Sequence, residues 1–229
     1  MAVKPIPFSG PMVRAILDGK KSQTRRVLKP QPSCDAIEPH RVHSNEFIPW
    51  RDGEALASIV APYAAGDMLW VREAWRCLDG LDQLSGGEIA ERCTDAGYHR
   101  PWAPIRYEAD GECTNWIREP HGFGTEAGRY RHGRFMPRWA SRLTLRVTDV
   151  RVQRLWEISE ADAKAEGVSS PPEGDHPEWS TYDSYTDVFA ELWDSLNAKR
   201  GLGWNANPWV AAYTFDVIRQ NVDQIEEGK

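Results

Sequence analysis

Apolar residues recur at helical spacing in three parts of the chain. Residues 12–17 carry them on one face, and Gly19 then ends the predicted helix, because glycine readily adopts the left-handed conformation at a helix C-terminus. Residues 182–196 show a longer amphipathic pattern. A third helix is predicted between Ser159, a favourable N-cap, and Gly167. The pattern therefore predicts three helices separated by stretches of different character.

Four other stretches have the pattern of β-strands. Residues 68–75 begin with large apolar side chains at both odd and even positions, which predicts a strand buried on both faces. Residues 143–152 and 209–218 are predicted strands, and residues 6–8 suit an edge strand. Strands interleaved with three helices predict an α+β fold, in the form of a small mixed barrel and not a doubly wound sheet.

Two long stretches interrupt this pattern. Residues 31–62 are broken by prolines and show little regular structure. Residues 79–128 are polar and glycine-rich, with a short strand expected at 105–109. We interpret both as loop-rich insertions into a single domain, 1–229, whose charged tail covers residues 219–229.

Net charge and its distribution limit the kinds of partner. The chain carries a net charge of −6, which argues against non-specific binding to long nucleic acid. Positive charge is concentrated in residues 129–154, which hold eight arginines and a single acid, Asp149. Local binding of a phosphate is therefore compatible with an acidic protein. The 11 tryptophans are spread along the chain and suit either cores or platforms for stacked bases.

The cysteines and the N-terminus bear on compartment and metal binding. The four cysteines lie far apart and form no CxxC motif, which predicts free thiols. No hydrophobic signal region and no membrane-length apolar run is present, so we expect a soluble, cytoplasmic protein with no membrane partner. The spacing of five potential ligands fits no zinc pattern, so we expect no metal and no cofactor: Cys77, Cys93, His99, Cys113 and His121.

The segment ILDGKKSQTRR, residues 16–26, is the strongest candidate for chemistry. Lys21 and Thr24 share one face if this segment is a helical turn, and they can also converge from an irregular turn. A lysine beside a hydroxyl group can accept its proton, provided that burial lowers the lysine pKa toward neutrality. The alternative is a solvated basic helix end. A strand is expected to begin only afterwards, at Val27 and Leu28.

Charged residues at the ends of predicted elements are further candidates. Glu166 ends the third helix directly before Gly167, where a carboxylate faces the unfavourable end of the helix dipole. It either has a functional role or is a surface carboxylate with a small energetic cost. Arg72 and Glu73 lie at the end of a predicted strand and either serve a substrate site or form a buried ion pair.

Five segments resemble the ASCH superfamily in the same order. They are ILDGKKSQTRR, the Gly66-Asp67 turn with MLWVREAW, RLTLRVTDVR, SEADAKAEG and NPWVAAYTF. The resemblance implies a PUA-like fold, a small β-barrel with flanking helices and a cleft suited to RNA or modified nucleosides. It does not cover the two insertions, and the chain as a whole looks most like the larger ASCH proteins of bacteriophages and prophages.

One branch of ASCH proteins hydrolyses N4-acetylcytidine to cytidine and acetate with a lysine, a threonine and a glutamate. Lys21, Thr24 and Glu166 match these three positions, with the lysine two residues after a glycine and the threonine three residues later. The resemblance implies that Thr24 attacks the acyl carbon, Lys21 accepts its proton, and Glu166 protonates the leaving amine or activates water. Arg26 or backbone N–H groups would hold the oxyanion. The insertions could reshape the pocket for another substrate.

The arginine and aromatic segment is a second candidate site. Arginines between aromatic side chains suit phosphates and stacked bases. We select Arg131, Arg134, Arg138 and Trp139 as substrate-binding candidates, and their neighbours of the same kind are Arg129, Tyr130, His132 and Phe135. The alternative, with equal weight, is a charged loop that pairs with the acidic remainder of the protein.

Three hypotheses of function follow from these patterns. The first is a hydrolase acting on a modified nucleoside or nucleotide, with N4-acetylcytidine as the specific substrate. The second is a non-catalytic RNA-binding module of PUA type, and the third is an ASCH ribonuclease. The expected partner is a modified nucleoside or RNA, and the oligomeric state is left open.

Overall fold

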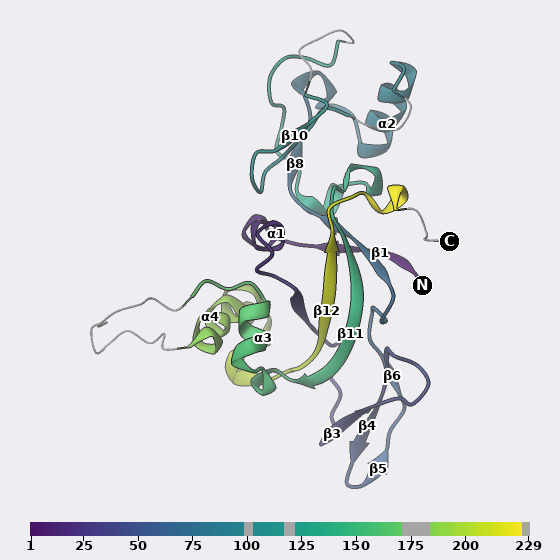
Figure 1. Ribbon diagram of the computed structural model, residues 1–229. Helices are drawn as coiled ribbons and strands as arrows, with labels where there is room; N and C mark the ends of the chain where they lie inside the picture. Colours follow the sequence, from purple (N-terminus) through teal and green to yellow (C-terminus); the bar gives the residue numbers. More distant parts are fainter. Residues whose placement is uncertain (99–102, 117–121, 171–183, 226–229) are drawn as a thin grey trace, which may run out of the picture. The chain divides into compact units, whose positions relative to one another are not determined.

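The computed structural model describes residues 1–98, 103–116, 122–170 and 184–225 (Figure 1). Within these residues the chain is a mixed α+β protein, as the sequence predicts. Its helices of at least six residues are α1 (Gly10–Leu17), α2 (Gly86–Asp95), α3 (Glu160–Ala165) and α4 (Tyr185–Asn197). None of the described helices is long and apolar enough to span a membrane.

The largest sheet has five strands in the order β1-β7-β11-β12-β2. β1 pairs with β7 in parallel, and β12 pairs with β2 antiparallel. Among the described residues β1 and β2 are the edges of this sheet, so it is not closed into a barrel there. The strands are β1 (Val3–Pro7), β2 (Gln23–Val27), β7 (Met68–Arg72), β11 (Thr144–Arg154) and β12 (Trp209–Ile218).

Two smaller sheets lie within the stretches that the sequence marks as insertions or beside them. One contains β8 (Trp75–Arg76), β9 (Ile105–Tyr107) and β10 (Cys113–Thr114). The other contains β3 (Ala36–Pro39), β4 (Glu46–Arg51), β5 (Glu54–Ala55) and β6 (Ile59–Val60). Residues 31–62 are therefore more regular than expected, because backbone pairing builds strands there without an alternating apolar pattern.

The chain divides into two compact units, which are described separately. The first contains residues 15–67 and 146–216 with Met1, and the second contains residues 2–14, 68–145 and 217–229. The expectation of one ASCH-like domain stays a prediction.

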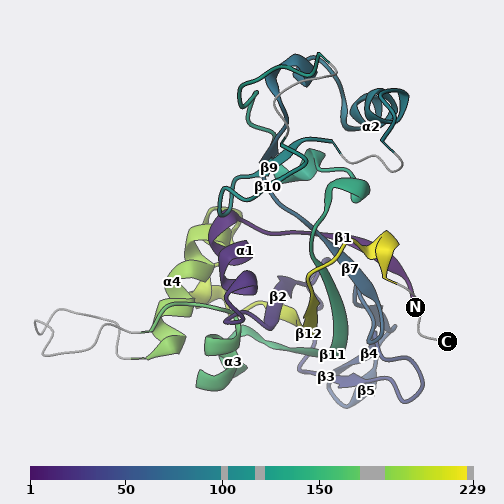
Figure 2. The same cartoon turned by 45° about the horizontal axis from the view of Figure 1, so that its top comes forward.

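In the first unit, α3 and α4 pack against each other (Figure 2). Their apolar faces share a buried cluster that includes Ala163 of α3, Phe189 and Trp193 of α4, and Val210 of β12. α4 begins at Ser184, whose side chain accepts a hydrogen bond from the backbone of Asp187. This cluster fixes α3, which carries Glu166 at its end.

In the second unit, residues 79–128 contain a helix and contribute to an apolar cluster that they share with residues before and after them. α2 begins with a capping box in which the side chains of Ser85 and Glu88 each bond the backbone of the other. Ile89 and Cys93 of α2 are fully buried with Trp75 of β8 in one apolar cluster. The segment thus contains short regular elements between its loops, of which α2 and β9 each bury two side chains.

Candidate functional site

The start of β2 and the end of α3 meet at Gly167. This residue has a φ of +80°, and a Cβ atom there would lie 2.7 Å from Cβ of Lys21 and 2.9 Å from Cβ of Ala15. Glycine is therefore required both by the backbone conformation and by the close approach of the chain. The helix itself starts at Ser159, whose side chain accepts a hydrogen bond from the backbone of Asp162.

Lys21 and Glu166 form a buried ion pair at this junction. The Lys21 Nζ atom donates to the Oε2 atom and to the backbone carbonyl of Glu166, each at 2.8 Å. Lys21 is 1% exposed and Glu166 is 5% exposed. Their backbones also form an isolated antiparallel bridge. The structure thus brings together two of the three residues that the sequence selects for catalysis.

Arg25 extends this pair into a network with a second carboxylate of α3. Its Nη1 atom donates to Oε1 of Glu166 at 3.1 Å, and its Nη2 atom lies 3.1 Å from Oδ2 of Asp162. The second contact has an ion-pair distance but not the geometry of a hydrogen bond. Gln23 and Arg151 donate to Oδ1 of the same carboxylate at 3.0 Å. The network therefore joins two carboxylates of the α3 region, Asp162 and Glu166, to three cationic side chains, those of Lys21, Arg25 and Arg151.

Burial and neighbouring charges shift pKa values in this network. Burial lowers the pKa of Lys21, and this effect outweighs the opposing effect of Glu166; the positive charges of Arg26 and Arg25 lower it further. Burial raises the pKa of Asp162, but hydrogen bonds and positive charges around it hold the pKa at about 2. Lys21 therefore loses its proton more readily than an exposed lysine.

Thr24 lies inside β2, next to this network, and is 2% exposed. It pairs with Tyr213 of β12, so the two side chains are on the same face of the sheet, and strand alternation directs Gln23 and Arg25 to the other face. Thr24 is therefore on the face opposite to the contact between Arg25 and Glu166. The helical turn that would give Lys21 and Thr24 one face is wrong, since the strand begins at Gln23 and not at Val27.

The face of Thr24 is lined by aromatic and cationic groups. The rings of Tyr63 and Tyr213 meet edge to face at 5.1 Å, and the charge of Arg26 acts on both hydroxyl groups. Burial lowers the pKa of Arg26 and raises that of Tyr213. The Tyr213 hydroxyl group is buried; it interacts with the backbone of Tyr63, which opposes the rise of its pKa, but this contact does not have the geometry of a normal hydrogen bond. A buried polar atom in this state is a point where a polar ligand atom could bind.

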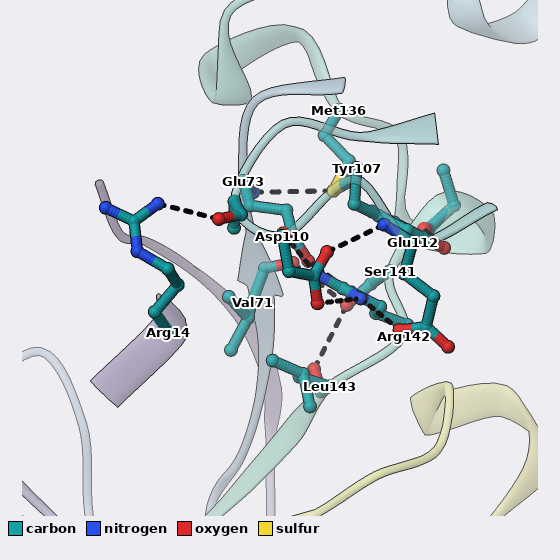
Figure 3. A network of polar contacts seen from close by, with 12 residues as sticks. Arg14, Val71, Glu73, Tyr107, Asp110, Glu112, Met136, Ser141, Arg142 and Leu143 are labelled. Atoms are coloured by element: carbon teal, nitrogen blue, oxygen red, sulfur yellow. Dashed lines mark hydrogen bonds and ion pairs between the residues drawn. The ribbon is translucent and has the colours of Figure 1, made fainter. Parts of the chain in front are cut away.

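Glu73, in the second unit, is part of a different buried network (Figure 3). Arg142 binds its two carboxylate oxygens with Nε and Nη2, each at 2.9 Å, and also binds Asp110 at 2.9 Å and Glu112. Burial raises the pKa of Glu73, and Arg142 opposes this effect. The guanidinium group of Arg142 lies 4.0 Å from the ring centroid of Tyr107. Glu73 thus belongs to a buried ion pair, although its partner is Arg142 and not Arg72.

The other candidates of the second unit have mainly internal contacts. Arg72 donates to the Gly133 carbonyl at 3.2 Å and lies over Trp70. Trp139 donates to the Gly86 carbonyl, and Arg138 forms an ion pair with Asp223.

The side chain of Arg131 is held by backbone groups. Its guanidinium group donates to the carbonyls of Leu81, Asp82 and Leu84 and lies over Trp75. Arg131 is 8% exposed, and its contacts favour a structural role over phosphate binding.

The same segment nevertheless borders a hollow of about 560 Å³. Its lining includes Arg129, Tyr130, His132 and Phe135, together with the first residues of α2. Tyr130 and Phe135 are 53% and 66% exposed, which is unusual for large aromatic side chains. Arg134 is exposed beside them, with its guanidinium group 5.5 Å from the ring centroid of Phe135. Exposed aromatic rings among cations are available to a ligand.

Sequence reasoning missed several residues that surround the candidate catalytic group. Asp162 precedes Glu166 by four residues, which on a helix places both on one face, so this pair could have been found from spacing. Gln23 and Arg25 alternate with Thr24 along a strand, but their roles depend on where that strand begins. Nothing in the local sequence indicates that Tyr63 lies beside Tyr213. His99 and His121, considered as metal ligands, lie outside the described residues, and the four cysteines are free.

Comparison with family models, with curated proteins and with solved structures gives no match for this chain.

Proposed function

We propose that the chain is a hydrolase with an ASCH-type, PUA-like fold that removes an acyl group from the exocyclic amine of a modified nucleoside or nucleotide, with N4-acetylcytidine as the first substrate. The observation that carries this proposal is the buried contact between Lys21 and Glu166, directly before the strand that bears Thr24. The two residues are 145 positions apart, and their contact combines a proton acceptor with a proton donor.

The proposed reaction begins with Thr24. Its hydroxyl oxygen attacks the acyl carbon and its proton passes through one water molecule to Nζ of Lys21, whose lowered pKa supports this role. Because Thr24 and the contact of Arg25 with Glu166 lie on opposite faces of β2, this transfer has to run past the start of the strand, where Lys21 precedes Gln23. The bond between the acyl carbon and the amine then breaks, and the amine takes a proton from the pair formed by Lys21 and Glu166. Water, activated by the same pair, hydrolyses the Thr24 ester, releases the acid and restores the hydroxyl group.

The face of Thr24 supports substrate binding in this proposal. The guanidinium group of Arg26 is a cation beside that face and stabilises the oxyanion that forms on the acyl oxygen. The buried hydroxyl group of Tyr213 offers a hydrogen bond to a polar atom of the base, and the ring of Tyr63 offers a surface for stacking. Nζ of Lys21 lies 2.8 Å from Oε2 of Glu166, so the proton that Lys21 takes from Thr24 stays beside both residues until the leaving amine accepts it.

The test is turnover of N4-acetylcytidine by four purified variants. We expect Thr24→Val and Lys21→Met to abolish the release of cytidine and acetate, and Glu166→Gln to reduce it at least about 100-fold. Lys164→Met is the matched control, because Lys164 is an exposed lysine on α3 whose amine lies over the ring of Tyr185, and it should retain full activity. Activity of Thr24→Val equal to that of the wild type would contradict the proposed nucleophile.

The hollow of the second unit favours a second candidate function, the binding of single-stranded RNA. Tyr130 and Phe135 would stack on bases, while Arg129 and Arg134 would contact phosphates. This candidate does not require the catalytic group. The third hypothesis, a ribonuclease, becomes an outcome of the same experiment, because cleavage of the RNA would be visible in it.

The test of this second candidate is fluorescence anisotropy with a short labelled RNA at several salt concentrations. Tyr130→Ala and Arg134→Ala should weaken binding, and Arg134→Ala should reduce the salt slope by about one unit for each phosphate that it no longer neutralises. Arg92→Ala, an exposed arginine of α2, is the control. An unchanged salt slope in Arg134→Ala would contradict phosphate binding and favour the alternative, a charged loop that pairs with the acidic remainder of the protein.

A further inference from the structure

The turn between β3 and β4 gathers two histidines and a glutamate. His40, His43 and Glu46 each offer one ligand atom, and these atoms all lie within 4.8 Å of one another. The backbone of the turn holds them in this arrangement, since the N–H group of His40 donates to the Glu46 carbonyl at 2.8 Å and that of Glu46 donates to the His43 carbonyl at 3.2 Å. The cluster belongs to the first unit, and none of its residues is part of the network of Lys21, Arg25, Asp162 and Glu166.

Contacts within the turn and with Ser58 hold the three side chains near one another. The rings of His40 and His43 are stacked at 5.2 Å with an angle of 16° between their planes. Ser58 donates to Oε1 of Glu46 at 2.6 Å, which fixes the carboxylate and leaves Oε2 for another partner. Backbone N–H groups approach Nδ1 of His40 at 3.2 and 3.4 Å. These two hydrogen bonds hold the ring of His40 in place.

We propose that His40, His43 and Glu46 form a binding site for a divalent transition metal, with Zn²⁺ as the first candidate. Two imidazoles and one carboxylate are a common protein donor set for zinc, and water takes the fourth position. Ligand atoms around zinc lie about 3.3 Å apart when the bonds are about 2.0–2.1 Å long. The cluster therefore has to contract by at most about 1.5 Å, and the exposed side chain of His43 can rotate to do so.

The donor types also limit the metal. Imidazole nitrogen favours zinc, nickel and copper, whereas calcium and magnesium require mostly oxygen ligands. A metal here would tie the turn between β3 and β4 together, because its ligands come from both ends of the turn. Its fourth position would remain open to water or to an exogenous ligand.

The experiment uses the full chain after removal of metals with a chelator, followed by titration with Zn²⁺ in a calorimeter. The wild type should bind one Zn²⁺ per chain and should show a higher melting temperature with Zn²⁺ than without it. His43→Ala and Glu46→Gln should each weaken this binding at least about tenfold. Glu54→Gln is the matched control, because Glu54 is an exposed glutamate of the same small sheet outside the cluster, and it should bind Zn²⁺ as the wild type does.

The outcomes distinguish the site from other sources of zinc affinity. Circular dichroism checks that the variants are folded, which is expected because His43 is exposed. If His43→Ala did not fold, Glu46→Gln alone would decide the question. No binding by the wild type, or equal binding by the wild type and by both cluster variants, would overturn the proposal.

Discussion

Removal of the Glu166 carboxylate should destabilise the first unit strongly. The carboxylate accepts from Nζ of Lys21 at 2.8 Å and from Nη1 of Arg25 at 3.1 Å, and all three side chains are at most 5% exposed. In Glu166→Ala, Lys21 keeps only the backbone carbonyl of residue 166 among these contacts, and its charge is left without compensation. Breaking a buried ion pair in this way costs about 3–5 kcal/mol of the free energy of unfolding.

Substitution of Lys21, the partner of Glu166, should lower the free energy of unfolding by less. Lys21→Met retains most of the apolar stem and removes the buried charge, while Glu166 remains paired with Arg25. We expect a loss of about 1–2 kcal/mol for Lys21→Met, and a loss in the double variant that is smaller than the sum of the two single losses.

Urea denaturation followed by circular dichroism measures these free energies, with Glu191→Ala on the exposed face of α4 as the surface control. The control should change the free energy of unfolding by at most about 0.5 kcal/mol. A loss below about 1 kcal/mol in Glu166→Ala, or strictly additive losses in the double variant, would refute the buried pair as an energetic unit.

Three further predictions concern stability. Asp162 has a folded pKa of about 2, below its ordinary value of 3.8, so its contribution of about 1–2 kcal/mol to the free energy of unfolding is present above pH 4 and is lost as the pH falls toward 2. In Asp162→Asn the urea midpoint should therefore depend less on pH between 4 and 2, and an unchanged pH dependence would contradict this. Gly167→Ala should cost about 1–3 kcal/mol because of its positive φ and its contact with Lys21, whereas a melting temperature equal to that of the wild type would refute the close approach. Arg142→Met should cost about 3–5 kcal/mol at neutral pH because it leaves Glu73 buried and unpaired; the loss should shrink in acid, where Glu73 is neutral, and a loss independent of pH would contradict the pairing.

The elements with strong local signals could be predicted from the sequence. The strand expected at residues 209–218 is β12, and that expected at 143–152 is within one or two residues of β11. The helix expected from the N-cap at Ser159 is α3. In each case an alternating or helical apolar pattern coincides with a cap or turn residue, so local preference and packing agree.

The remaining elements depend on contacts that a local pattern does not contain. The apolar pattern does not predict α2, although Ser85 and Glu88 have the spacing of a capping box, because only two of its residues are buried. The same pattern places β2 too late, since its residues Gln23 and Arg25 are polar and are buried by contacts with α3, α4 and β12. The burial of these polar side chains is set by tertiary structure, so the hydrophobicity pattern of the sequence does not predict the strand.

The candidate catalytic residues could be predicted only in part, because some of their contacts depend on tertiary structure. The spacing around Lys21 and Thr24 selects both residues, and the resemblance adds Glu166. The contact of Lys21 with Glu166 could be proposed from sequence, but the opposite faces of Thr24 and Arg25 follow only once residues 23–27 are known to form a strand. Tyr63 and Tyr213 come together through the fold alone.

The most direct measurement of the central claim is the reaction itself. Purified wild-type protein is incubated with N4-acetylcytidine between pH 5 and 10, and cytidine and acetate are quantified by chromatography. The account predicts equal amounts of both products, a rate that rises as Lys21 loses its proton at a pH below the ordinary lysine pKa, and no products from Thr24→Val. Absence of cytidine at every pH with the folded wild type, or equal turnover by Thr24→Val, would contradict it.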